Sequence, residues 1–417
     1  MAWTAEIFDS STNTTYDITN RIIEISGEDQ LGAESNRFSV SCKGIDIFHK
    51  LHIMTVRKNG VKRYSGFIIN QTDSDKGYKH TEFECVDWTH IFNNRILAEV
   101  YNSTDQFLGR PDLIIKDIIS KKAPELTTNN IRQVNYSIET IQFPYDKLMD
   151  AMSKVMDFLP TWYWYVDPDK DVHLFNYFES EGVTFSRKAD GRFNFLQNSL
   201  SVKYIGEAQA NRIWIIGAKR ASGSYIDVFY TANGVQRYFG PLPYEPNYTE
   251  IYLNDLLMES KLEQNDDQQQ DFLINKAQRI IQIPPNITTP WNGTIKVRFR
   301  PTIQVIDYFE NAPSVKQNGL FEKAIKSKDI TDRMSARQFG KAEIKRKSTD
   351  RRIITLSTYE DVKVGQKCNV DILVNDPIKG DWDVRGSFLV SSVRTSVTTT
   401  ESFTQELRQV EMEEIVG

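Results

Sequence analysis

The residues that could do nucleophilic chemistry gather in one short segment. Cys85, Asp87 and His90 stand close together in HTEFECVDWTH, where a thiol, a carboxylate and an imidazole meet. Catalysis of this kind needs a base within hydrogen-bond reach of the thiol and a group that stabilises the oxyanion. No glycine-rich turn nearby supplies that second group. We therefore expect a buried cysteine beside a turn, and a cysteine or metal hydrolase ranks lowest among the functions considered.

A second segment has the alternating carboxylates of a calcium loop. Asp167, Asp169 and Asp171 lie in VDPDKDVHLF. A calcium loop needs glycine at its sixth position and glutamate at its twelfth, where this chain has Val172 and Phe178. The segment therefore predicts a solvated hairpin turn and no metal site.

Four consecutive aromatic residues precede that turn. Because side chains alternate along a strand, Trp162 and Trp164 would share one face, and Tyr163 and Tyr165 the other. Such a pair could stack on a sugar ring, so carbohydrate binding stays open as an alternative function. Packing of one face against the preceding helices is the interpretation we favour.

No other motif carries chemistry. The basic stretch GKAEIKRKSTDRR is expected to be a solvated helix face or the rim of a protein contact. The sequence contains no GxGxxG, P-loop, HExxH or GxSxG pattern. We therefore predict no catalytic residue, no cofactor-binding residue and no metal ligand, and expect that the protein is not an enzyme.

The composition is that of an ordinary globular protein. The chain has 417 residues, is 40% hydrophobic and 26% charged, and has a net charge of −5, which gives no reason to expect tight nucleic-acid binding. A length of this kind predicts roughly two to four domains. The three cysteines are scattered and the N-terminus has no secretory pattern, so we expect synthesis in a reducing cytoplasm. No apolar run reaches the ~18 residues of a membrane span.

Hydrophobic periodicity divides the chain into four segments. Residues 1–98 alternate apolar and polar, with Asn59-Gly60 as a hairpin turn and a slip of the alternation near Tyr64, and predict a first β domain. Residues 99–197 predict an α/β insert of two helices and a hairpin. Residues 198–350 predict strands, a hairpin at Asn233-Gly234, a polar loop between short helices and one helix capped by Thr331 or Asp332. Residues 351–417 return to strands and complete a second β domain.

Two distant stretches share one outline. Gly66 is followed by Phe83 in RYSGFIINQTDSDKGYKHTEFECV, and Gly386 is followed at the same spacing by Phe403 in RGSFLVSSVRTSVTTTESFTQELR. Each is preceded by a strand-like segment, HIMTV or CNVDILV. We interpret the pair as a divergent duplication of one antiparallel β unit. Any two hairpins can match at so few positions, so chance similarity stays the alternative.

The order of these segments resembles the baseplate hub proteins of long-tailed bacteriophages, which have relatives in contractile injection and type VI secretion machines. RIIEISGEDQLGAESNRFSVSC and MTVRKNGVKRYSGFIIN are similar to the opening strands of that family's tube-like first domain. RPDLIIKDII, PYDKLMDAMSKVMDF and WYWYVDPDKDVHLF are similar to its helix–helix–hairpin unit. NSLSVKYIGEAQANRIWIIGA, ITDRMSARQFGKAEIKRKS and VGQKCNVDILV resemble its later segments.

The resemblance implies a mainly β fold with two tail-tube-like antiparallel barrel or sandwich domains and smaller α/β parts. It implies a virion protein made in the host cytoplasm, a homotrimer that adapts a sixfold tail tube to a threefold spike or fibre. Its implied partners are the distal tail or tail-tube protein, the tape measure protein and the central spike or fibre protein. DNA would be met only in passage through the channel, without membrane insertion. A receptor-recognition protein of the tail that binds carbohydrate is the alternative.

Overall fold

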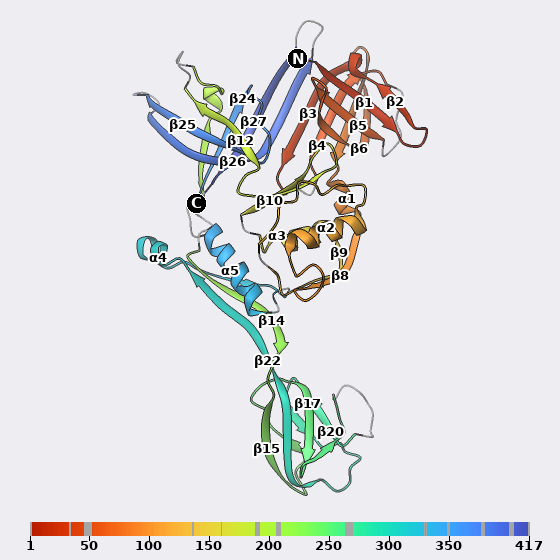
Figure 1. Ribbon diagram of the computed structural model, residues 1–417, viewed down its shortest axis with the longest axis vertical. Coiled ribbons are helices and arrows are strands. Elements are labelled where there is room, and N and C mark those ends of the chain that lie inside the picture. Colours follow the sequence, from red (N-terminus) through yellow and green to blue (C-terminus); the bar gives the residue numbers. More distant parts are fainter. Residues whose placement is uncertain are drawn as a thin grey trace. The chain divides into compact units, whose positions relative to one another are not determined.

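The computed structural model describes residues 2–32, 35–45, 52–135, 137–159, 161–187, 192–205, 210–262, 270–328, 330, 332–347, 351–376, 380–399 and 404–415. The chain forms two compact units: residues 1–212, 310–322 and 341–417 make the first, and residues 213–309 and 323–340 make the second. The fold is mainly β with several antiparallel sheets and a few short helices (Figure 1), which confirms the predicted fold class. The predicted segment borders at residues 98, 197 and 350 stay predictions.

The N-terminal strands form the first β repeat, in the spatial order β3-β4-β7-β6-β5-β1-β2 with every pair antiparallel. Its strands are β1 (Trp3–Asp9), β2 (Thr14–Asp17), β3 (Ile22–Gln30), β4 (Arg37–Lys43), β5 (Ile53–Lys58), β6 (Val61–Asp75) and β7 (Lys79–Asp87), with a 3-10 turn at Thr19–Arg21. Alternate residues such as Ile25, Val40 and Phe83 are fully buried in one core. The burial therefore follows the period of two that the sequence predicts.

Local turn signals in this repeat are confirmed. Asn59 and Gly60 have φ of 50° and 83° and join β5 to β6. The register between these strands shifts where Val56 faces Tyr64, which is the predicted slip. Both features depend on residues close in sequence, and the positive φ angles are those that Asn-Gly turns adopt readily.

The second β repeat has the spatial order β13-β24-β27-β26, with β25 on β26 and β12 on β25. Its strands are β12 (Ser180–Ser186), β13 (Ser201–Ile205), β24 (Arg351–Thr358), β25 (Gln366–Asp376), β26 (Gly380–Thr399) and β27 (Thr404–Glu414). Its own core contains Leu356, Cys368, Phe388 and Met412, all fully buried. The pair β25–β12 differs from its counterpart β5–β1 in the first repeat, since β12 runs parallel to β25 whereas β1 runs antiparallel to β5.

The two repeats belong to one continuous sheet (Figure 1). β26 pairs with β3 along seven residue pairs, from Ser392 opposite Gln30 to Thr398 opposite Glu24. Val397 of β26 is fully buried and belongs to the core of the first repeat. Strands from the two ends of the chain are thus joined by both hydrogen bonds and packing.

Bulges show how the repeats correspond. The register of β6 on β7 shifts between Ile68 and Asn70, and that of β26 on β27 shifts between Val390 and Ser392. Aligning the bulges matches Gly66 with Phe388, so the predicted match of Gly66 with Gly386 is two residues out of register. The repeated strand arrangement is present, but the two glycines do not occupy corresponding positions in it. Glycine is needed at Gly66 for a local reason, since a Cβ there would lie 1.9 Å from the Val86 carbonyl oxygen. Phe403 lies outside the described residues.

A small α/β part separates the repeats in sequence. It contains α1 (His90–Asn93), β8 (Ile96–Asn102), α2 (Pro111–Lys122), β9 (Thr140–Lys147), α3 (Leu148–Met156), β10 (Trp162–Val166) and β11 (Val172–Asn176), and a 3-10 turn follows at Gln197–Ser199. The predicted helix start at Pro111 and the hairpin of β10 with β11 are confirmed. Pro111 fits because its missing N–H is not needed in the first helical turn.

The later segment has its own β core, in which Phe239, Ile251, Phe272 and Val297 are buried. Its elements are β14 (Arg212–Ala221), β15 (Ile226–Asn233), β16 (Tyr238–Phe239), β17 (Pro246–Leu253), β18 (Leu256–Met258), β19 (Ser260–Leu262), β20 (Phe272–Asn275), β21 (Ile280–Gln282), β22 (Asn292–Glu310), α4 (Ala312–Asn318), β23 (Glu322–Lys326) and α5 (Arg333–Lys347).

Two predictions in this segment are wrong. The Asn233-Gly234 turn does not close a hairpin, because β15 pairs with β22 and β16 pairs with β21. The described part of residues 255–282 forms short strands where short helices were predicted. The helix α5 is confirmed: Asp332 caps it by accepting from the Ser335 N–H at 2.7 Å, and Thr331 lies outside the described residues. Glycine is required at position 340 of this helix, because a Cβ on Gly340 would lie 2.0 Å from the Phe309 ring.

Candidate functional site

Cys85 and Asp87 of the possible thiol site have separate surroundings, and His90 lies at the start of α1. Cys85 is buried in the first repeat's core, and burial raises the pKa of its thiol well above the usual value. Asp87 accepts from the side-chain amide of Asn36 at 2.9 Å and from the Thr89 hydroxyl. Burial raises the pKa of Asp87 to about 6, against these hydrogen bonds. A protonated, enclosed thiol is not a nucleophile, so the structural role expected for Cys85 fits its position.

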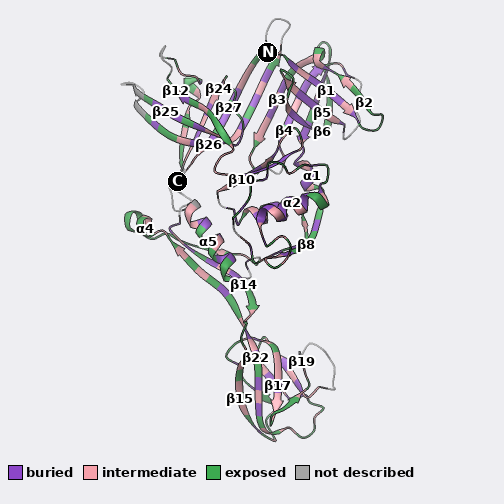
Figure 2. Ribbon diagram, in the orientation of Figure 1, coloured by how far each residue is buried: buried purple, intermediate pink, exposed green. Residues whose placement is uncertain are grey.

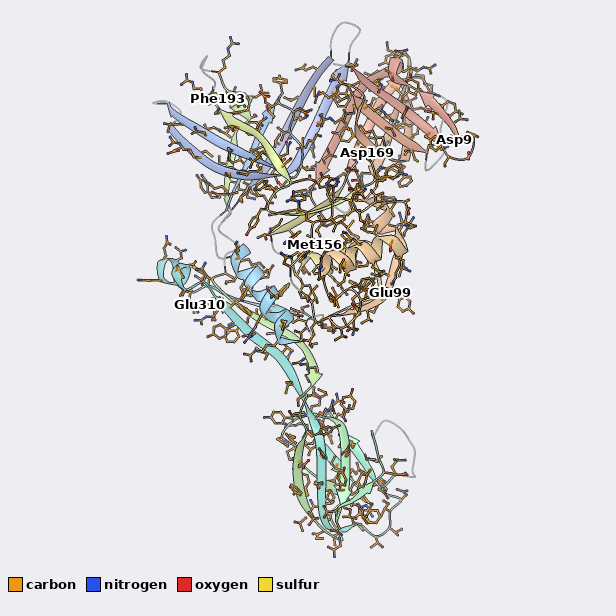
Figure 3. The ribbon with its side chains drawn as sticks, viewed as in Figure 1. Asp9, Glu99, Met156, Asp169, Phe193 and Glu310 are labelled. Carbon is orange, nitrogen blue, oxygen red and sulfur yellow. The ribbon has the colours of Figure 1, made fainter. Side chains whose placement is uncertain are left out.

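The carboxylates of the possible calcium loop are occupied by protein donors. Asp171 accepts from the Asn129 N–H at 2.9 Å and the Asn130 side-chain amide at 2.7 Å. Asp167 accepts from the Asp171 N–H at 2.9 Å, and Asp169 (labelled in Figure 3) forms an ion pair with Lys62 at 2.7 Å. These bonds fasten the predicted hairpin turn, but Asp171 is buried, only 6% exposed, where a solvated side chain was predicted. Among the residues that the structure describes, no group of three or more His, Cys, Asp or Glu side chains is arranged to hold a metal ion.

A buried histidine site beside this turn was missed by sequence reasoning. The two ring nitrogens of His173 face Asp167, at 3.2 Å, and Glu179. Burial by itself would lower the pKa of His173, but the hydrogen bonds to the two carboxylates raise it to about 9. Tyr165 stacks on the ring, with 4.5 Å between centroids, and donates to Glu179 at 2.6 Å. The site locks the β10–β11 hairpin to the strand that follows.

The aromatic run does not form an open platform. Trp164 is buried, only 4% exposed, and its ring lies against Phe92 with 5.4 Å between centroids. Phe92 lies on α1, a short helix that the sequence did not predict, so this contact is with a helix other than the two expected. The basic stretch is also engaged: Lys347 pairs with Glu343 at 3.0 Å, and Arg352 pairs with Glu414 on β27.

The strongest candidate for a functional surface is the polar face of the continuous sheet. Figure 2 shows buried and exposed residues alternating along these strands. One row of directly opposed residues crosses five strands from β26 to β6: Ser396, Ser26, Ser39, Glu84 and Asn70. The next row is Thr398, Glu24, Ser41, Glu82 and Thr72.

Hydrogen bonds and ion pairs order this face. Ser26 and Ser39 hydroxyls lie 2.9 Å apart, and the Asn70 side-chain amide donates to Glu84 at 2.8 Å. Arg394 on β26 pairs with Glu28 on β3 at 2.8 Å, across the junction of the repeats. A shallow hollow lies here, lined by Glu28, Arg37, Glu82, Glu84 and Arg394 among others. The face is hydrophilic and rich in hydroxyls and carboxylates.

No protein-family model and no curated protein sequence matches the chain. Solved structures do. A tail protein from Neisseria meningitidis MC58 is 8% identical with a TM-score of 0.58, over 99% of this chain and 96% of that one. A 43 kDa tail protein of prophage MuSo2 from Shewanella oneidensis is 10% identical with a TM-score of 0.58, over 99% and 98%. The prophage tail protein gp18 from Listeria monocytogenes EGD-e is 7% identical with a TM-score of 0.54, over 98% and 94%.

The chain has the fold of phage tail proteins. The likeness extends over nearly the whole of each chain, so it includes both β repeats and the parts between them. At this level of sequence identity the likeness concerns the fold alone, and the function must be argued from the surface. Among the described residues, no helix is both long and apolar enough to cross a membrane.

In this tail-protein fold the polar rows could have been found from the sequence. RFSVSCK and HTEFECV alternate, so Phe38, Val40 and Phe83 mark the core side, and Ser39 and Glu84 the other. What no local pattern gives is the junction of β26 with β3, which makes one surface from two distant segments.

Proposed function

We propose that the chain is a structural virion protein, a trimeric baseplate hub at the tail tip of a bacteriophage. The observation that carries this proposal is the presence of two corresponding β repeats side by side in one sheet. Three chains would place six such repeats in a ring. A ring of this kind matches a sixfold tail tube at one end and keeps threefold symmetry for a spike or fibre at the other.

The polar face of the sheet is the proposed lining of a DNA channel. DNA carries dense negative charge and binds surfaces rich in Lys and Arg. The rows described above bring Glu24, Glu82 and Glu84 to this face, with Ser and Thr between them. Glu28 lies on the same face together with Arg37 and Arg394, and the ion pair with Glu28 offsets the charge of Arg394. A lining of hydroxyls and carboxylates would let a duplex slide past without adhering.

The proposed partners follow from the place of a hub in a tail. They are two further copies of this chain, the distal tail or tail-tube protein, the tape measure protein and the central spike or fibre protein. Synthesis would take place in the host cytoplasm. The proposal includes no enzymatic activity, since Cys85 is enclosed and the carboxylates of the β10–β11 turn are occupied by protein donors.

Carbohydrate binding through the aromatic run receives no support from the fold, because Trp164 packs inside against Phe92. We therefore keep the hub as the function that the geometry supports best. Native mass spectrometry of the purified chain, alone and with its tail-tube partner, tests it. A trimer under at least one of these conditions is expected, and a monomer under both would overturn the proposal.

A further inference from the structure

Several strand edges of the continuous sheet have no partner among the described residues, and two of them, on β6 and β13, correspond in the two repeats. β6 pairs with β5 through Phe67 and with β7 through Asp75, so from Asn70 onward it is paired on one side. β13 pairs with β24 alone. Exposed strand edges present rows of unmet N–H and C=O groups, and they are favoured sites for pairing with another strand.

These edges correspond to the two strands that join the repeats within the chain. Asn70 matches Ser392 at the bulge, so the end of β6 matches the part of β26 that pairs with β3. The neighbouring strands continue the match. In the first repeat, Asn70 of β6 faces Glu84 of β7, which faces Ser39 of β4. In the second repeat, Ser392 of β26 faces Glu411 of β27, which faces Thr355 of β24.

The last step of the match reaches the other edge. Ser26 of β3 faces Ser39, and Ser201 of β13 faces Thr355. β13 therefore occupies the same position in the second repeat that β3 occupies in the first. Within the chain, β3 of the first repeat binds β26 of the second. Since β13 corresponds to β3 and β6 corresponds to β26, the equivalent pairing between two chains would join β13 of one chain to β6 of another.

We propose that β13 adds to the edge of β6 of a second copy of this chain, antiparallel, in the register of the β3–β26 junction. This proposal rests on the proposed function, which supplies the ring, and it adds the strands and register of the contact. Within the chain Ser26 faces Ser396 and Glu28 faces Arg394. In the same register between two chains, Ser201 of one copy would face Ser74 of the next copy, and Lys203 would face Thr72 of that copy.

Side chains at the edges suit such a contact. Tyr204 is 70% exposed on β13 and would be covered on the core side, opposite Gln71 of the next copy. Lys203 is exposed on the polar face, where it would lie beside Thr72 and within reach of Glu82, the neighbour of Thr72 on β7. The edges carry charged residues, including Asp73 and Asp75, and such charges discourage indiscriminate strand addition. Each chain offers one edge of each kind, so the contact is head-to-tail and forms a closed ring when its rotation closes.

A pair of engineered cysteines tests the register. Directly opposed residues of an antiparallel pair bring their Cβ atoms to ~4.5–5.5 Å, which a small backbone shift brings to the ~3.5–4.5 Å of a disulfide. The variant Thr72→Cys with Lys203→Cys should, under mild oxidation, run as a covalent ladder that ends at the trimer on a non-reducing gel. The natural cysteines Cys42, Cys85 and Cys368 are buried and unpaired, so they add little background.

The matched control is Thr72→Cys with Ser201→Cys. It uses the same strands and the same face but is two residues out of register, at ~7–8 Å. It should give little ladder, as should each single variant. Equal cross-linking by both pairs would overturn the register. A trimer by mass in which neither pair cross-links would overturn this contact while leaving the hub intact, and a monomer by mass would overturn both.

Discussion

Ser26 on β3 lies directly opposite Ser396 on β26, at the centre of the junction between the two β repeats. The first residue belongs to the opening strands of the chain and the second to its closing strands. Between them the chain forms a complete α/β part and a second compact unit. The ends of the chain therefore fold as one sheet, and the stability of each repeat depends on the other.

Substitution of Val397 tests how far the stability of the first repeat depends on a strand of the second. It lies on β26 but is fully buried in the first repeat's core. Val397→Ala should lower the free energy of unfolding by about 2 kcal/mol, through lost burial and a residual cavity. Urea unfolding of the two proteins measures the difference.

The matched control is Val100→Ala, since Val100 is 55% exposed. It should change the free energy of unfolding by less than about 0.5 kcal/mol. Equal effects of the two substitutions would contradict the account of the junction.

Gly66 is required by a close backbone approach. A Cβ there would lie 1.9 Å from the carbonyl oxygen of Val86 on β7, a backbone atom that moves only with its strand. Gly66→Ala should destabilise the protein by about 3 kcal/mol, the upper end for overpacking. Thermal unfolding checks this, with Gly223→Ala as control, because nothing lies within 4 Å of a Cβ at Gly223. An unchanged melting temperature for Gly66→Ala would contradict the register of β6 on β7.

His173 makes the β10–β11 hairpin sensitive to alkaline pH. Its pKa is raised from 6.5 to about 9 by Asp167 and Glu179, against the effect of burial. Because the folded pKa lies above the unfolded one, the stabilisation is fully present below about pH 6.5. It should be lost as pH rises from there through about 9, as the imidazolium loses its proton.

His173→Gln should flatten that part of the pH–stability profile. Chemical denaturation at a series of pH values compares the two proteins, and NMR titration of the His173 ring gives its pKa directly. A measured pKa below 6.5 would show that burial outweighs the two carboxylates.

Charge on the polar face should govern DNA adhesion. Glu24, Glu82 and Glu84 lie on this face of β3 and β7. The native protein should not retain duplex DNA at moderate salt. The triple substitution of these residues by lysine should create binding that weakens steeply as salt rises, because each phosphate contact releases counterions.

A control with the same charge change uses Asp227→Lys, Asp255→Lys and Glu259→Lys, which lie in the second compact unit. Fluorescence anisotropy with a labelled duplex measures both variants across a salt series. Equal binding by the two would show that overall charge, and not this face, decides adhesion.

Local features of the fold were predictable from the sequence because their causes are local. Asn59-Gly60 closes its hairpin, Pro111 begins its helix, and the slip near Tyr64 appears as a register shift. Phe38, Val40 and Phe83 were recognisable as core residues from alternation alone.

Features that depend on distant partners were not predictable. The Asn233-Gly234 turn is real, with Gly234 at φ of 76°, yet β15 leaves it to pair with β22. His173 gave no signal in the sequence, because Glu179 reaches it only after the chain turns. The two repeats were visible as an outline, but their true alignment needed the bulges at Asn70 and Ser392.

A particle image of the purified protein, viewed down its symmetry axis, tests the central claim most directly. The account predicts a closed ring of three chains in which six similar lobes alternate around a central channel. A ring with another number of chains, or single chains that stay apart at high concentration and with the tail-tube protein added, would contradict it.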